Sequence, residues 1–252
     1  MEYLAQELID GIIDRVPLER MRFCSLVTRS WRRRSQQRHF EIIWFKDEDL
    51  ADRWYTRISQ DPEGVPSYVH SFHLSGLNHC REPGMLNRIL RCFVNLRSLR
   101  LIRTDLSLLS GRQNPVLFNN FGAGVTELLI NNPTCTYGTF VSLILSFPNL
   151  ETLAIVNLLG PKEAPPSIVP SAQKRVLKEL QMYRGGSEVV TALSQCPLSF
   201  QAISINRPPP GEPLPVGLRA LLMASSETVR RVTLGGKSPS PSIYYRGLNG
   251  HR

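Results

Sequence analysis

The chain has 252 residues, of which 42% are apolar and 20% are charged, the balance of a folded protein with one large domain or two small ones. No apolar run reaches the ~18 residues that a transmembrane helix needs. The N-terminus carries Glu2, Glu7 and Asp10, unlike the basic start of a secretory signal. The five cysteines are scattered and odd in number, so we expect reduced thiols and a cytoplasmic or nuclear protein with no membrane contact.

The formal net charge of +9 is distributed unevenly. Residues 1–45 carry a net +2, residues 46–66 a net −3 and residues 67–252 a net +10. The excess in the C-terminal three quarters of the chain would favour acidic partners.

The first 45 residues predict a small helical module. A wide apolar stripe has the spacing of an amphipathic helix and consists of Leu4, Leu8, Ile9, Ile12, Ile13 and Val16. Pro17 ends this helix because proline has no N–H for the hydrogen-bond ladder. A second helix is predicted from about Leu18 and a third from about Ser25, which brings Val27 close to Trp31. Helices this short bury their apolar faces only by packing together.

Two spaced segments of this module, LAQEL at 4–8 and CSLVTRSW at 24–31, make it resemble an F-box. That family typically opens with Leu-Pro-x-Glu and closes with a Val-Cys/Thr-Lys/Arg-x-Trp signature. Ala5 stands where the family usually has proline, a residue favoured in the first helical turn. The resemblance implies docking onto the Skp-type adaptor of a cullin-RING ubiquitin ligase, and by matching position it implies contacts from Leu4, Ala5, Leu8, Ile9, Ile12, Val27 and Trp31. The alternative is an unrelated helical bundle.

An arginine run ends the module. Its members are Arg29, Arg32, Arg33, Arg34 and Arg38. We expect a solvated helix face near a helix C-terminus, where positive charge complements the helix dipole. Nuclear import or nucleic-acid contact is the alternative.

Residues 46–66 predict a linker helix. Leu50, Trp54 and Ile58 recur every four residues, which predicts a short amphipathic helix over about 48–59. We expect it to act as a spacer packed on the next domain.

From residue 67 to 236 the chain repeats the pattern apolar-x-x-apolar-x-apolar about seven times, beginning at residues 69, 96, 125, 150, 177, 200 and 229. The period resembles that of leucine-rich repeats, ~20–29 residues. We therefore expect an α/β protein: a three-helix F-box module followed by a curved solenoid of short parallel strands. Helical returns are predicted at 85–94, 140–147, 188–196 and 217–225. The proline-rich stretches 158–170 and 207–215 predict extended returns, and residues 237–252 an irregular tail.

Residues that alternate with the repeated apolar anchors are predicted to face out of the concave side of the sheet. The predicted substrate-binding residues there are His73, Arg100, Ile102, Leu129, Asn131, Val156, Gln181 and Tyr183. An apolar centre with polar flanks suits a protein partner better than a phosphate backbone. The alternative is that a loop of the same chain covers this face. A basic edge around Arg100 is expected to be solvated, with an acidic or phosphorylated substrate segment as the other possibility.

The sequence contains no motif of a catalytic or nucleotide-binding site. His70 and His73 lie near His79 and Cys80 in the sequence. His70 and His73 point to opposite faces of a strand, however, so we expect no metal site. We also expect no cofactor and no catalysis. The sequence predicts a substrate-recognition subunit of an SCF-type ubiquitin ligase. The alternatives are a leucine-rich repeat scaffold outside such a ligase and, less favoured, a basic nucleic-acid-binding protein.

Overall fold

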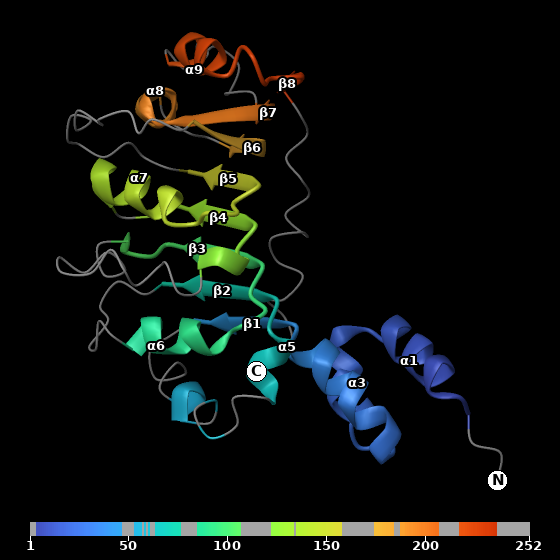
Figure 1. Ribbon diagram of the computed structural model, residues 1–252. Helices are drawn as coiled ribbons and strands as arrows, with labels where there is room; N and C mark the ends of the chain where they lie inside the picture. The colour runs from blue at the N-terminus through green and yellow to red at the C-terminus, as the bar shows by residue number, and fades with distance from the viewer. Residues whose placement is uncertain are drawn as a thin grey trace.

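The computed structural model describes residues 4–46, 53–56, 58, 60, 64–76, 85–106, 122–133, 135–157, 174–183, 187–206 and 217–235. In this part of the chain a small helical module precedes one eight-stranded parallel sheet with helices packed beside it (Figure 1). The predicted α/β class with a parallel sheet is therefore confirmed. The predicted tail, 237–252, lies outside the described residues.

The helical module, residues 4–40, contains α1 (Gln6–Arg15), the 3-10 turn η1 (Leu18–Arg20), α2 (Met21–Cys24) and α3 (Arg29–Phe40). Its core is a separate cluster of Ile9, Ile13 and Met21, against which Val16 and Trp31 pack. The third helix begins at Arg29, four residues later than the sequence predicts. The reason is that Thr28 is extended, with φ −151° and ψ 170°, so that residues 25–28 form a turn.

Helix α3 runs almost directly into the first strand, β1 (Ile42–Phe45), and only Glu41 separates them. The last four residues of the predicted 1–45 module therefore lie in the sheet. Phe40, Ile43 and Phe45 form an additional copy of the apolar pattern, 29 residues before the copy that begins at Val69. The overlap with a helix hid this copy, so the described sheet has eight strands rather than the seven that the repeats predict.

Part of the linker is helical, at residues 53–56 and 58, and α5 (Val65–Tyr68) follows. Trp54 packs edge-on against Phe40, with ring centroids 5.8 Å apart, and contacts Phe45 at 6.1 Å. The side chain of Ile58 is buried in the core of the sheet. The described part of the linker thus packs where α3 meets β1, and the rest of 46–66 lies outside the described residues except for Lys46, residue 60 and Gly64.

The sheet keeps its strands in chain order, each parallel to the next. After β1 the strands are β2 (Ser71–Ser75), β3 (Ser98–Ile102), β4 (Glu127–Asn131), β5 (Thr152–Val156), β6 (Arg175–Tyr183), β7 (Leu198–Ile205) and β8 (Arg231–Leu234). Parallel neighbours need a crossover connection. The crossovers include α6 (Met85–Cys92), the 3-10 turn η4 (Gly122–Gly124), α7 (Tyr137–Leu145), α8 (Ser187–Gln195) and α9 (Leu218–Ala224).

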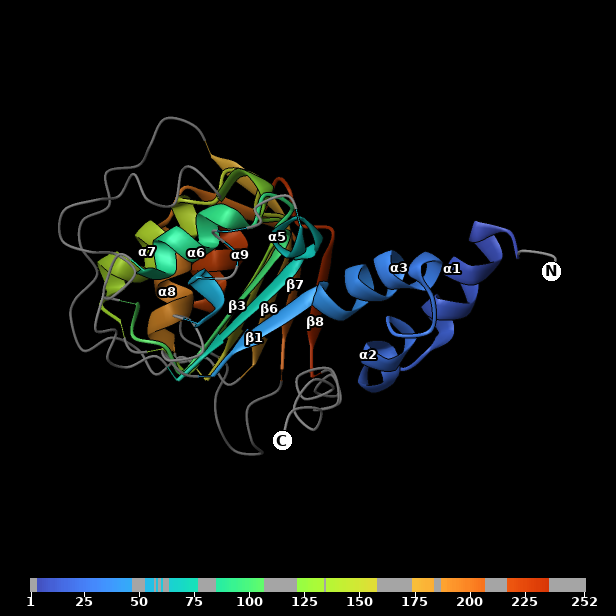
Figure 2. The same cartoon turned by 90° about the horizontal axis from the view of Figure 1, so that it is seen from below.

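Helices α6, α7, α8 and α9 all lie on one side of the sheet (Figure 2). They overlap the four predicted helical returns. Helices α6 and α9 are each two residues shorter than predicted, α7 begins three residues earlier, and α8 is shifted by one residue. The proline-rich segments 158–170 and 207–215 lie outside the described residues. We call the side of the sheet opposite these helices the front face.

Strict alternation separates the core from the front face. Phe72 and Leu74 on β2 point toward the helices and are fully buried, and the matching pairs from β3 to β7 are at most 4% exposed. The exception is β8 at the end of the sheet, where Val232 is 42% and Leu234 51% exposed. The other edge strand, β1, buries Ile43 and Phe45 because Trp54 and Ile58 pack there. No element in the described part of the chain covers β8 in the same way.

A repeated backbone contact fastens the first five strands to one another. The carbonyl oxygen just before one strand accepts hydrogen bonds from two N–H groups at the start of the next strand. In the first instance the Glu41 oxygen accepts from His70 N and Ser71 N, both at 3.0 Å. His70 and Arg97 repeat this arrangement. Because Glu41 is also the residue that follows α3, the helical module is tied to the sheet through the ladder itself.

Candidate protein-binding surfaces

The helical module exposes seven large apolar side chains, which together we call the apolar patch. Its members are 42% (Leu18) to 76% (Leu26) exposed, and they are Leu4, Leu8, Ile12, Leu18, Phe23, Leu26 and Val27. The module projects beyond the first edge of the sheet, away from its helices (Figures 1 and 2). Isolated exposed apolar side chains are normal, but a group of this size on about 40 residues is typical of an interface.

The patch arises because α1 divides its apolar residues between two directions. Leu4, Leu8 and Ile12 are four residues apart and share an exposed line, since positions i and i+4 lie on one side of a helix. Ile9 and Ile13 point about a quarter turn away, into the module's core. One wide stripe in the sequence is therefore a core line and a surface line in the structure.

The predicted adaptor-binding residues fall into two groups. Leu4, Ala5, Leu8, Ile12 and Val27 are exposed and lie on or beside the apolar patch. Ile9 is 6% exposed and belongs to the core, so it supports the surface without reaching a partner.

Trp31 is half-buried and packs against the core cluster around Ile9. The sequence prediction missed Leu18, Phe23 and Leu26. Leu18 precedes the short helix α2, Phe23 lies within it and Leu26 follows it. The signal for an exposed apolar line was an apolar residue every three to five positions.

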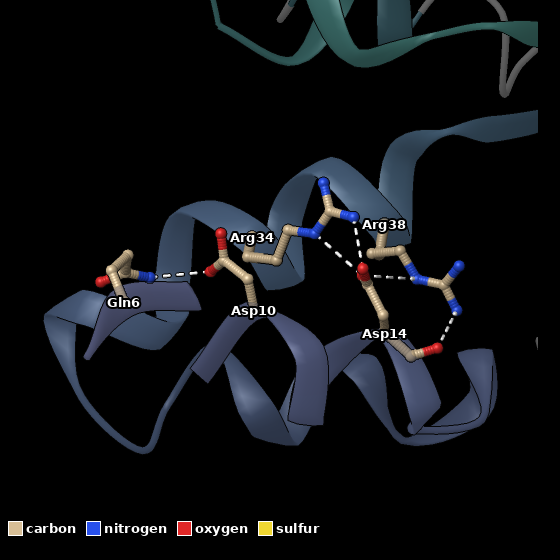
Figure 3. A network of polar contacts seen from close by, with 5 residues as sticks. All are labelled: Gln6, Asp10, Asp14, Arg34 and Arg38. Carbon is tan, nitrogen blue, oxygen red and sulfur yellow. Dashed lines mark hydrogen bonds and ion pairs between the residues drawn. The ribbon is translucent and has the colours of Figure 1, made fainter. Parts of the chain in front are cut away.

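On the side of α1 opposite the exposed line of Leu4, Leu8 and Ile12, polar contacts hold the helix against α3 (Figure 3). Arg34 donates from Nε to Asp14 Oδ1 at 2.8 Å and from Nη2 to Asp14 Oδ2 at 2.6 Å. Arg38 donates from Nη2 to the Asp14 carbonyl oxygen at 3.2 Å, and its Nε lies 3.8 Å from Asp14 Oδ1. Gln6 Nε2 donates to Asp10 Oδ1 at 2.7 Å and to the Ser30 carbonyl oxygen at 3.2 Å. These contacts set the orientation of α1 and therefore of the patch.

The same contacts engage two of the five arginines in the run, Arg34 and Arg38. The hydrogen bond with Arg34 lowers the pKa of Asp14, and the reciprocal bond raises the pKa of Arg34. Arg34 and Arg38 are thus structural partners of α1 rather than part of a solvated face. Arg29, Arg32 and Arg33 are exposed, as the prediction for the run expected.

The strand register brings the eight predicted substrate-binding residues together on the front face. One row runs across β2, β3 and β4 as His73, Arg100 and Leu129, and continues through Ala154 to Gln181. The second row consists of Ile102, Asn131, Val156 and Tyr183, on four adjacent strands. His73 and Ala154 are buried, and the other members of the two rows are half-buried. The two rows form one continuous surface, mixed apolar and polar.

Trp44 extends the first row onto β1, opposite His73. The two rings meet edge to face with centroids 5.6 Å apart, and Lys46 Nζ lies 5.3 Å from the centre of the Trp44 ring. The sequence prediction missed this residue because it assigned 42–45 to the helical module. Its Nε1 is buried without a hydrogen-bond partner among the residues that the structure describes.

Burial decides the charge state of His73. Removal from water, together with the nearby Arg100 charge, lowers the pKa of His73 to about 3. The imidazole is therefore neutral near pH 7, and its Nε2 lies 3.0 Å from the hydroxyl oxygen of Ser71. Further along the sheet, the Tyr183 hydroxyl donates to Gln181 Oε1 at 3.4 Å. The β2 end of the rows thus contains the Trp44 ring and a neutral His73 imidazole. His73 therefore adds no positive charge to that of Arg100.

Within the described residues, no group of three or more His, Cys, Asp or Glu side chains is arranged to hold a metal ion. His79 and Cys80 lie outside them. Burial raises the pKa of Cys196 to about 12, and burial together with the nearby Asp105 charge raises the pKa of Cys135 to about 11. These two thiols are protonated at neutral pH and are poor nucleophiles. In the same part of the chain, no helix is both long enough and apolar enough to cross a membrane.

No known protein family matches the chain, and none of the curated proteins matches it either. The two surfaces therefore indicate what the molecule does.

Proposed function

We propose that this protein is the substrate-recognition subunit of an SCF-type cullin-RING ubiquitin ligase. The helical module would act as an F-box that docks on a Skp-type adaptor. The parallel sheet and its helices would act as a curved leucine-rich repeat solenoid whose front face holds a protein substrate. The chain would act by positioning and would catalyse no reaction itself.

The observation that carries the proposal is the apolar patch. A three-helix module that keeps Ile9, Ile13 and Met21 for its own core has few apolar side chains to spare. This module nevertheless exposes seven large ones. Burying an apolar side chain contributes about 1.5–3 kcal/mol, so covering most of the patch would stabilise a complex considerably. The F-box resemblance names the partner that would cover it.

Two features support the second half of the proposal. Strands that follow one another in chain order, with the described helices α6, α7, α8 and α9 all on the same side of the sheet, are the arrangement expected of stacked repeats. The Glu41 contact and the packing of Trp54 on Phe40 connect α3 to β1 without a flexible spacer. A stiff connection of this kind would keep a bound substrate at a constant distance from the ligase and raise its effective concentration there.

The test is binding of the full chain to a recombinant Skp-type adaptor, followed by size exclusion and calorimetry. We expect a complex at micromolar concentrations or below. Leu26→Asp and Leu8→Asp should each weaken it about 100-fold, the effect of losing a buried interface anchor. Val94→Asp is the matched control, because Val94 is 71% exposed but lies after α6, outside the helical module. Failure of the wild-type chain to bind would favour a repeat scaffold outside a ubiquitin ligase.

A further inference from the structure

The apolar patch has a basic border. We infer that the partner of the helical module presents an acidic surface around an apolar groove, so that electrostatic attraction to exposed arginines speeds docking. The inference rests on the proposed function, because it describes the surface of the adaptor that the patch would meet.

The charge of the module is unbalanced at its surface. Outside the contacts around Asp14, residues 4–40 expose six arginines, namely Arg15, Arg20, Arg22, Arg29, Arg32 and Arg33. The same residues expose two glutamates, Glu7 and Glu19. Six positive charges against two negative ones leave a net excess of four on a module of about 40 residues.

Several of these arginines border the patch directly. Arg15 follows Ile12 by three residues on α1, so the two share one exposed side of the helix. The Arg22 guanidinium carbon lies 4.7 Å from the centre of the Phe23 ring. Arg29 follows Val27 by two residues and begins α3. Arg20 ends η1, two residues after Leu18. We call Arg15, Arg20, Arg22 and Arg29 the basic border.

The remaining two arginines continue the charge along α3. Arg32 and Arg33 follow Arg29 by three and four residues, which puts both on the side of the helix that Arg29 occupies. Arg34 and Arg38 point the other way and are occupied by Asp14. The charges of Arg29, Arg32 and Arg33 can therefore be removed by substitution without disturbing the contacts that hold α1 to α3.

An acidic protein surface is the occupant that this arrangement favours. Charges around an apolar centre contribute mainly to the rate and specificity of association, whereas the apolar side chains contribute most of the affinity. Attraction between unlike surfaces raises association rates roughly 10- to 1,000-fold at low salt. An anionic membrane shares the same two chemistries, so the experiment includes it as a competing outcome.

The experiment measures association of the full chain with a recombinant Skp-type adaptor by stopped-flow fluorescence or surface plasmon resonance. For the wild type we expect the association rate to fall about tenfold between about 50 mM and about 500 mM NaCl, as screening shortens the reach of the charges. The triple variant Arg29→Gln, Arg32→Gln, Arg33→Gln should associate about tenfold more slowly at the low salt concentration. At the high salt concentration it should match the wild type.

The matched control is the triple variant Arg91→Gln, Arg97→Gln, Arg230→Gln. It removes the same charge from exposed arginines on and beside the sheet, away from the helical module. We expect wild-type rates from it at every salt concentration. Equal slowing by both triple variants would overturn the inference, because overall charge rather than the module's arginines would then be responsible.

Other outcomes separate the inference from the proposed function. An adaptor complex that Leu26→Asp disrupts but that shows no salt dependence would overturn the acidic partner and leave the proposed function in place. No complex at all would overturn both. Binding to vesicles of phosphatidylcholine and phosphatidylserine, lost in the Arg29, Arg32, Arg33 variant and without adaptor binding, would identify a membrane as the partner instead.

Discussion

Arg34 on α3 donates two hydrogen bonds to the carboxylate of Asp14 on α1, from Nε at 2.8 Å and from Nη2 at 2.6 Å. A paired, planar contact of this type restrains direction as well as distance. It lies on the side of α1 away from the apolar patch, so the angle at which the patch is presented depends on it.

Asp14→Asn should therefore destabilise the helical module. Both side chains are more than a third exposed, so solvent screening limits the effect to about 1 kcal/mol. The pKa of Asp14 is lowered in the folded chain, so its contribution is present above the unfolded pKa of about 4 and is lost as the pH falls through the folded value. Urea unfolding at neutral and acidic pH checks this. Glu19→Gln, an exposed carboxylate on η1, is the control and should leave stability unchanged.

Arg103→Gly should stabilise the sheet. The residues after β2, β3, β4, β5 and β8 have a positive φ and are Gly76, Arg103, Asn132, Asn157 and Gly235. Arg103, with φ 49°, is the member whose side chain suits this conformation least. The left-handed conformation costs a non-glycine residue about 1–2 kcal/mol, while glycine adds backbone entropy in the unfolded state. We expect a net gain of about 0.5 kcal/mol in urea unfolding, whereas Arg97→Gly should lose stability.

His73 should make the folded state sensitive to acid. The unfolded imidazole takes up a proton near its ordinary pKa of about 6.5, but the folded one does so only at about 3. Between these values the unfolded state binds more protons, so stability falls as the pH falls, by up to about 1.4 kcal/mol per pH unit. His73→Gln should flatten stability against pH between about 4 and 6. Ring proton shifts of His73 that titrate near pH 6.5 in the folded chain would contradict the expectation.

Leu129→Arg tests the front face. Leu129 on β4 lies beside Arg100 on β3, in the middle of the first row. An arginine at position 129 would have to lose its hydration to contact an apolar substrate surface, which weakens binding while the core behind β4 stays intact. We expect proximity labelling in cells to lose specific partners, with an unchanged melting temperature. Val94→Arg, at an exposed site after α6, is the control. An unchanged partner list would place substrate binding elsewhere on the molecule.

Most of the sheet could be predicted from the sequence. Its anchors recur at almost constant spacing, and the period of two within each copy decides which side chains face the core. Phe72, Leu99 and Leu128 are buried as this alternation requires. The front-face residues between them followed directly, because parallel pairing in register lines up equivalent positions on neighbouring strands. The copy at Phe40 escaped notice because the same residue ends a helix.

For the helical module, the residue pattern alone predicts that α1 is amphipathic, that Pro17 ends it and that arginines fill α3. It could not determine which apolar residues of α1 would be covered, because periodicity defines positions around one helix but not where its neighbours lie. Packing of Met21 and Trp31 decided that Ile9 would be core, while Leu8 and Ile12 stayed exposed. Asp14, twenty residues before Arg34, found its partner only when α1 and α3 came together. Those tertiary contacts made an apolar stripe into a surface.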